Sequence, residues 1–252
     1  MTSRRSTLAN IKSDMVKTAN AGLWLTKYLD KKSENDKTAR TTLVKEVVEK
    51  ASNQELQSLY RRFFERWKET LEAYGAETRK TQVRGRMVIG LGSESVLETA
   101  VTLHHTYGVP YIPGSALKGL ARNFARNMEG WTDKHSEVVF GNEKKRDNNT
   151  FAGFITFFDA LLIPDEYGNK RALHTDVMTV HHQGYYMGAG VPPADWDDPI
   201  PVSFLSATGT YLLALAGPAE WISPTFKLLE IALKEEGVGA KTSSGYGRMI
   251  FV

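Results

Sequence analysis

Residues 111–122 of this chain read Tyr-Ile-Pro-Gly-Ser-Ala-Leu-Lys-Gly-Leu-Ala-Arg, a stretch that ends one element and begins another. Pro113 and Gly114 interrupt the preceding chain, and Ser115 is a residue type that favours the N-cap of a helix. The apolar residues that follow recur at helical spacing and define one face: Leu117, Leu120, Ala121, Phe124 and Met128. We therefore expect an amphipathic helix to start here.

A second face of this predicted helix is basic. Lys118, Arg122 and Arg126 are four residues apart, which places them in one row along a helix. Free backbone N–H groups at the start of a helix, here at Gly114 and Ser115, suit phosphate when cations lie nearby. The pattern indicates a phosphate-binding surface, although an ordinary solvated helix has the same pattern.

A glycine-rich segment lies near the C-terminus, where residues 237–247 read Gly-Val-Gly-Ala-Lys-Thr-Ser-Ser-Gly-Tyr-Gly. It is not a Walker A loop, because the glycine spacing is wrong and no Gly-Lys-Thr triplet occurs. Glycine lets a phosphodiester chain approach the backbone, and Lys241, Ser243 and Ser244 would then contact phosphates. Arg248 is expected to support the loop. A purely structural turn between the last helix and the last strand is the alternative.

The composition indicates a chain that can bury a sizeable core, as one large or two small domains. It has 252 residues, 41% of them hydrophobic, and no cysteine, which excludes disulfides and thiolate metal sites. No apolar run approaches the roughly 20 residues of a membrane span. The N-terminus also lacks an apolar signal core. We therefore expect a cytoplasmic protein.

The charge is distributed unevenly along the chain. Residues 1–80 hold 17 Lys and Arg against 11 Asp and Glu, a net charge of +6, whereas residues 81–252 hold 15 against 18, a net charge of −3. The first part therefore has a modest basic bias that suits an anionic partner.

The first 80 residues are predicted to be helical, with a polar linker over residues 30–42. The clearest signal covers residues 54–74, where apolar positions follow a period of 3.6 residues: Leu56, Leu59, Tyr60, Phe63, Phe64, Trp67 and Leu71. This stripe is expected to pack in the core, and docking on a neighbouring subunit is the alternative.

From residue 81 onward, strands and helices are predicted to alternate. The expected strands cover residues 81–91, 151–163, 172–186, 202–216 and 246–252. The expected helices begin at Ser115 and at Pro224, with the proline in the first turn of the second helix. Residues 187–198, rich in Gly, Pro and Asp, are expected to form a loop.

This order of elements is a βαββαβ pattern. It predicts an α+β class and the ferredoxin-like arrangement that RNA-recognition (RRM-like) modules also use. The predicted organisation is an N-terminal helical extension, residues 1–80, followed by a ferredoxin-like domain, residues 81–252, with an insertion around residues 174–201.

Together, the two motifs resemble those of the RAMP superfamily of CRISPR-associated proteins. That superfamily combines a ferredoxin-like domain with a Pro-Gly-Ser-x-x-Lys-Gly helix start, found here at residues 113–119, and a C-terminal glycine-rich loop. More narrowly, residues 81–252 resemble the sixth-subunit family of the type III-B (Cmr) effector complex. The positions that carry this narrower resemblance are Gly90-Leu-Gly92, Glu98, Leu103-His104, Tyr107-Gly-x-Pro110, Asp176-Val-Met178, His181 and Tyr185-Tyr186.

The resemblance implies a non-catalytic RNA-binding subunit that holds the 3′ part of the guide RNA (crRNA) and its target RNA. The partners it implies are other Cmr complex subunits, namely the backbone, small helical and terminal RAMP subunits, and no membrane. No cofactor or metal is expected. The residues expected to bind RNA are Gly114, Ser115, Lys118, Arg122, Arg126, Gly239, Lys241, Ser243, Ser244, Tyr246 and His181. Tyr185 and Tyr186 in the insertion would stack on bases without sequence preference.

Other interpretations are open at this point. Some RAMP proteins process guide RNA without a metal, with a His or Tyr as general base, and the pairs His104-His105 and His181-His182 are the candidates here. His174 and Asp176 could join the second pair in a metal site, but their spacing is not diagnostic. In the related backbone subunit a loop Asp cuts target RNA, whereas only Glu94 is present at the corresponding place here. A scaffold that contacts only protein is the third class.

Overall fold

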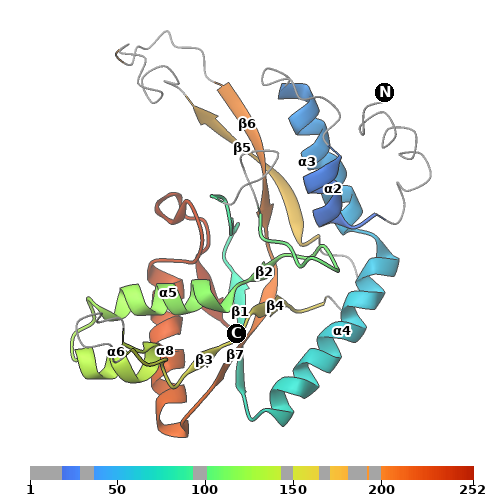
Figure 1. Ribbon diagram of the computed structural model, residues 1–252. Coiled ribbons are helices and arrows are strands. Elements are labelled where there is room, and N and C mark those ends of the chain that lie inside the picture. The colour runs from blue at the N-terminus through green and yellow to red at the C-terminus, as the bar shows by residue number, and fades with distance from the viewer. Residues whose placement is uncertain are drawn as a thin grey trace.

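The computed structural model describes residues 19–28, 37–92, 101–142, 150–164, 171–180, 192 and 200–252 (Figure 1). Its elements follow in chain order: α2 (Ala21–Lys27), α3 (Lys37–Ala51), α4 (Gln54–Ala73), β1 (Glu77–Val83), β2 (Tyr111–Ile112), α5 (Gly114–Ala125), α6 (Asp133–Phe140), β3 (Thr156–Phe157), β4 (Ala160–Leu162), β5 (Leu173–Val180), β6 (Ile200–Ala207), β7 (Thr210–Ala216), α8 (Ala219–Glu235), the short 3-10 helix η1 (Thr242–Ser244) and β8 (Met249–Phe251).

The helix α4 has nearly the bounds that its apolar stripe predicts. The Asn53 side chain accepts hydrogen bonds from the N–H groups of residues 55 and 56 and so caps its start. Gly75, with a φ of 76°, follows its end in a conformation that favours glycine. Tyr60 is buried, and its hydroxyl donates a hydrogen bond of 2.6 Å to the carbonyl oxygen of Leu162 in β4. The stripe therefore packs in the core, as predicted.

The preceding region differs from the sequence prediction. Helix α3 begins at Lys37, inside the segment expected to be a polar linker. Its buried residues Leu43, Val44 and Val47 belong to the hydrophobic core, so one apolar face fixes the helix despite its polar first turn.

The main sheet is antiparallel and has the order β2-β4-β7-β1-β8, with the short β3 also pairing with β7. Strand β7 lies in its interior, and all of its residues from Tyr211 to Ala216 are buried. The continuous apolar run of β7 is what a strand covered on both faces requires. Strand β1 starts at Glu77, four residues before the predicted start.

Helices α5 and α8 pack against each other, and α8 also contacts β7 and β8 (Figure 1). Two sequence predictions about these helices are wrong. Helix α5 begins at Gly114 with Pro113 at the N-cap position, so Ser115 is not the cap. Helix α8 begins at Ala219, which places Pro224 inside the helix and not in its first turn. Gly114 starts α5 because it lies so close to the Phe157 carbonyl that no side chain fits there.

Strands β5 and β6 form a two-stranded hairpin that projects beyond the main sheet beside α3 (Figure 1). They pair from Leu173 opposite Ala207 to Val180 opposite Ile200. Residues 202–216, predicted as one strand, therefore belong to two, β6 and β7. The chain turns between them at Thr208 and Gly209, whose φ of 113° suits glycine. Both ends of the predicted insertion thus lie in one hairpin.

Helix α6 is an element that the sequence analysis missed, because most of residues 129–149 are polar or charged and only a short apolar run, residues 138–140, lies among them. Its start is a capping box, in which Thr132 accepts from the His135 N–H and the His135 ring accepts from the Thr132 N–H. Within the described residues, helices and antiparallel sheets share one hydrophobic core, which confirms the α+β class. No helix in the described ranges combines the length and apolar character needed to cross a membrane.

Candidate nucleic-acid interface

The first backbone amide of α5 already has a partner. The Gly114 N–H donates a hydrogen bond of 2.7 Å to Oδ1 of Asp159, which lies between β3 and β4. A carboxylate at a helix N-terminus is stabilised by the helix dipole in the same way as a phosphate. The prediction of a free N–H at Gly114 is therefore wrong, since Asp159 fills this position. The sequence offered little signal for it, because Asp159 is the one charged residue of the largely apolar stretch 154–163.

The basic row of α5 lies beside its buried face. Gly114, Leu117, Ala121 and Ala125 point into the protein. Lys118 and Arg122 are half-buried, and Arg126, the C-cap residue, is exposed. Half-burial of the first two side chains is typical of Lys and Arg, whose aliphatic stems pack while the charged ends stay in water. The row thus lies at the surface of α5, and Arg126 is its most exposed cation.

Gly119 is a helix-interior glycine that the fold does not require. It is exposed next to Lys118, and a Cβ added to it would meet no atom within 4 Å. Glycine in a helix interior costs about 1 kcal/mol relative to alanine. The surface of α5 therefore lacks a side chain beside Lys118. Packing within the described residues gives no reason for this destabilising glycine.

Three glycines of the glycine-rich segment are required by the fold. A side chain on Gly239 would collide with the carbonyl oxygen of Val88, and one on Gly247 with that of Val238. Gly237 likewise lies against the backbone at Gly247. All three have positive φ values. Their close approach to neighbouring backbone supports the structural-turn interpretation for these positions.

The outer part of the same segment faces solvent. Lys241 adopts a left-handed conformation with a φ of 59° and starts the short helix η1. Ser243, Ser244 and Gly245 are exposed, whereas Lys241 is half-buried. The residues available for a phosphate contact are therefore those at the tip of the loop.

Tyr246 connects this loop to the β5–β6 hairpin. Its hydroxyl donates a hydrogen bond of 2.8 Å to Oδ2 of Asp176 in β5, and its ring lies 6.1 Å from that of Phe204 in β6. Burial, together with the Asp176 carboxylate, raises the pKa of Tyr246 above its usual value. Its phenol thus has a structural partner in addition to its predicted role in RNA binding, which stays a prediction.

Helix α5 and the glycine-rich segment are neighbours in space. The Asn123 side chain donates a hydrogen bond of 3.5 Å to Glu236, the residue immediately before the segment. Arg248, just after it, donates to the Lys234 carbonyl at the end of α8, which agrees with the expected supporting role. Figure 1 shows the loop leaving the end of α8 on the side of α5. The two sequence motifs therefore belong to one region of the molecule.

The histidine candidates divide into two groups. His104 lies among the rings of Phe63, Tyr107 and Tyr111. Burial lowers its pKa, and the Asp159 charge only partly opposes this. His104 is thus neutral near pH 7 and could accept a proton. His181 and His182 lie outside the described residues, as do the aromatic residues Tyr185 and Tyr186 and the acidic Glu94.

The described residues contain no group of three or more His, Asp and Glu arranged to hold a metal. His174 and Asp176, the two described members of the metal site considered above, have protein partners. Nε2 of His174 is 2.9 Å from the Arg171 carbonyl oxygen, and Asp176 accepts from Tyr246.

Comparison with known proteins identifies the superfamily to which this chain belongs. The family model of the RAMP superfamily matches residues 82–250, and the chain belongs to this superfamily. The resemblance inferred from the Pro-Gly-Ser helix start and the glycine-rich loop is thereby confirmed.

Within this class, the chain is similar to the CRISPR system Cmr subunit Cmr6 of Pyrococcus furiosus. The two are 31% identical over 82% of this chain and 79% of that protein. A chain in the cryo-EM structure of the type III-B Cmr-beta bound to cognate target RNA shares the fold, with a TM-score of 0.64 and 19% identity over 98% of this chain and 96% of that chain. The crystal structure of Cmr6 from Pyrococcus furiosus matches 70% of this chain and 98% of that chain, at 31% identity and a TM-score of 0.42.

Proposed function

We propose that this chain is a non-catalytic, RNA-binding subunit of a type III-B CRISPR (Cmr) effector complex. In this role it holds the 3′ part of the guide RNA with its target RNA and contacts neighbouring Cmr subunits in antiviral defence. The similarity to a Cmr subunit supports membership in such a complex. The fold that it shares with a chain of the type III-B Cmr-beta structure bound to target RNA is consistent with this membership.

The finer fold assignment belongs to the same proposal. The four strands β4, β7, β1 and β8 follow one another across the sheet, and α5 and α8 are the two helices of the βαββαβ order. We assign this part of the chain to the ferredoxin-like arrangement, in which the last strand in the chain pairs beside the first.

The observation that carries the RNA-binding proposal is the exposed surface of α5. Lys118, Arg122 and Arg126 offer cations along one row, and Gly119 removes a side chain at the point where a sugar-phosphate backbone would approach. Contacts to phosphate carry no sequence information, so they suit a subunit that must hold many different guides. The tip of the glycine-rich segment, with Lys241, lies in the same region.

The first test measures guide RNA retained by the assembled complex as the salt concentration rises. In Lys118→Ala with Arg122→Ala, retention should be lost at lower salt, and the slope of log affinity against log salt should fall by about 1.4 for two lost contacts to a single strand. Lys45→Ala with Lys134→Ala, which removes two exposed cations from α3 and α6, is the matched control. Equal salt curves for both double variants would refute the role of α5.

The second test uses Gly119→Ala. Alanine at this helical position should raise the free energy of unfolding by about 0.5–1 kcal/mol, because the added methyl group meets no atom and favours the helix. The same variant should weaken guide retention, because the methyl group occupies the space that RNA approaches. A variant that is more stable and retains RNA like the wild type would contradict this use of Gly119.

A metal-independent endoribonuclease is the second candidate. It is favoured by His104, which is neutral near pH 7 and lies near Asp159 at the start of α5. Repeat RNA should be cleaved in EDTA, and His104→Ala should abolish cleavage, if this candidate is correct. Absence of cleavage by the wild type supports the non-catalytic role. Crosslinked RNA in peptides from residues 112–126 and 237–248 would further separate an RNA-binding subunit from a protein-only scaffold.

A further inference from the structure

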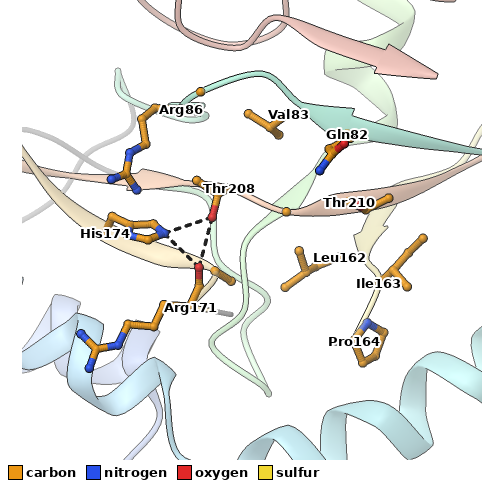
Figure 2. Close-up of a pocket in the computed structure, with 13 residues that line it drawn as sticks. Gln82, Val83, Arg86, Leu162, Ile163, Pro164, Arg171, His174, Thr208 and Thr210 are labelled. Atoms are coloured by element: carbon orange, nitrogen blue, oxygen red, sulfur yellow. Dashed lines mark hydrogen bonds between the residues drawn. The ribbon is translucent and has the colours of Figure 1, made fainter. Parts of the chain in front are cut away.

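A cavity of about 860 Å³ lies away from α5, between the ends of β1 and β4 and the base of the β5–β6 hairpin (Figure 2). One wall is apolar and contains Val83, Leu162, Ile163 and Pro164. Cavities of this size typically hold small organic ligands, with apolar walls and a few polar groups. Among the described residues that line it, none belongs to the predicted RNA-binding set.

The opposite side of the cavity is cationic. Figure 2 shows Arg86 and His174 close together, with Arg171 on the adjacent segment. Burial, together with the nearby charge of Arg86, lowers the pKa of His174. No Asp or Glu is present among the described residues that line the cavity.

Arg86 has an unusual environment. Its Nη1 atom is buried and has no hydrogen-bond partner among the residues that the structure describes. A buried charged donor without a partner is costly, because the water it loses is not replaced. The Arg86 side chain also lines the cavity, and a guanidinium bonds phosphate oxygens through two parallel N–H groups.

The neighbouring groups are held in fixed positions. Nε2 of His174 lies 2.9 Å from the Arg171 carbonyl oxygen and 3.1 Å from Oγ1 of Thr208. The Thr208 hydroxyl itself donates to the same carbonyl at 3.1 Å. These contacts fix the histidine ring and the backbone at Arg171 on this side of the cavity.

We propose that this cavity binds a phosphorylated nucleotide, either free or as the terminal nucleotide of an RNA strand. The phosphate lies at Arg86, and the base and sugar lie against the wall of Leu162, Ile163 and Pro164. Gln82 and Thr210 line the same cavity and supply polar groups for the base or ribose. Inorganic phosphate would leave the apolar wall uncovered, so it uses only part of the site. This site is separate from the proposed RNA surface on α5.

The test is isothermal titration of the purified full-length chain with adenosine 5′-monophosphate, adenosine and inorganic phosphate. We expect the monophosphate to bind at least about tenfold more tightly than either fragment, because only it contacts both walls. Arg86→Gln should weaken binding about tenfold or more, whereas Arg84→Gln, which removes an exposed arginine two residues away that does not line the cavity, should not. The proposal is overturned if inorganic phosphate binds as tightly as a monophosphate that does bind, or if Arg86→Gln and Arg84→Gln bind such a monophosphate equally well.

Short RNAs with a 5′-phosphate, a 3′-phosphate or only hydroxyl ends distinguish the two sources of the nucleotide. Arg86-dependent preference for one phosphorylated end, without binding of the free monophosphate, assigns the cavity to an RNA terminus. No Arg86-dependent binding of any of these ligands overturns the proposal. The double variant Lys118→Ala with Arg122→Ala should bind the monophosphate as the wild type does. A failure of the cavity proposal can therefore be distinguished from a failure of the function proposed for α5.

Thermal unfolding of Arg86→Gln without ligand excludes a merely structural role. Because Nη1 has no internal partner, the variant should unfold at the same or a higher temperature than the wild type. A lower unfolding temperature together with lost binding would show that Arg86 supports the fold and would count against the proposal.

Discussion

At the start of α5, the Pro-Gly-Ser motif can be recognised in the sequence, but the hydrogen-bond partner of its glycine cannot. The sequence Pro-Gly-Ser marks a helix start, but the pair that builds it is Gly114 and Asp159, which are 45 residues apart. Local spacing could not indicate that a distant carboxylate would occupy the first amide. Arg86 is a similar case, since its burial without a partner depends on contacts that only the folded chain provides.

At the same scale, His104 predicts a dependence of stability on pH. Burial lowers its pKa in the folded chain below the ordinary value of about 6.5. As the pH falls below that value, the unfolded chain takes up a proton before the folded chain does. Stability is therefore present above about pH 6.5 and is lost as the pH falls towards the lowered pKa.

Thermal unfolding at about pH 7.5 and about pH 5.5 measures this effect. We expect the unfolding temperature to fall at the lower pH, and His104→Gln to reduce that fall. His105→Gln, which changes an exposed neighbour, is the control and should leave most of the fall in place. An identical fall in His104→Gln and wild type would show that His104 is not responsible.

Among the secondary-structure elements, the predictions succeeded where the periodic spacing of apolar residues alone determines the type and bounds of an element. The stripe of α4 gave bounds that match Gln54–Ala73 at the start and differ by one residue at the end. They failed where tertiary contacts decide. Pro224 suggested a first turn, yet α8 starts at Ala219, because buried residues on both sides of the proline, Ile222 and Phe226, hold the helix in the core. The turn at Gly209 likewise divides residues 202–216, which were predicted as one strand, into β6 and β7.

The contact between α4 and the sheet gives the prediction at this scale. Tyr60→Phe removes the buried hydrogen bond to Leu162 and should lower the free energy of unfolding by about 1 kcal/mol. For a chain of this size, that corresponds to a fall of about 2–4 °C in unfolding temperature. Tyr74→Phe at the end of the same helix is the matched control, because Tyr74 is 66% exposed. Equal effects of the two substitutions would show that the hydroxyl of Tyr60 does not stabilise the contact.

For the whole molecule, the question is whether the N-terminal helices are a separable addition, as the predicted division at residue 80 assumes. The hydrophobic core includes Leu43 of α3 and Phe64 and Leu71 of α4 together with the buried residues of the sheet. Aromatic contacts join Trp67 and Tyr74 of α4 to Phe158, which lies between β3 and β4. Removing these helices would expose one face of the remaining core to water, which costs roughly 25 cal/mol for each Å² of apolar surface.

We therefore expect a fragment of residues 76–252, which keeps β1 intact, to lose cooperative thermal unfolding, while the full-length chain retains it. The measurement is circular dichroism during heating, with binding of a hydrophobic dye to detect exposed core. The same measurement on the full-length Tyr60→Phe variant is the control, because this variant loses only the hydrogen bond between Tyr60 and Leu162. A fragment that unfolds cooperatively within a few degrees of the full chain would instead establish residues 1–75 as an extension attached to an independent domain. In that case the proposed α5 surface and the nucleotide cavity, both built from residues beyond 76, should bind their ligands in the fragment as well.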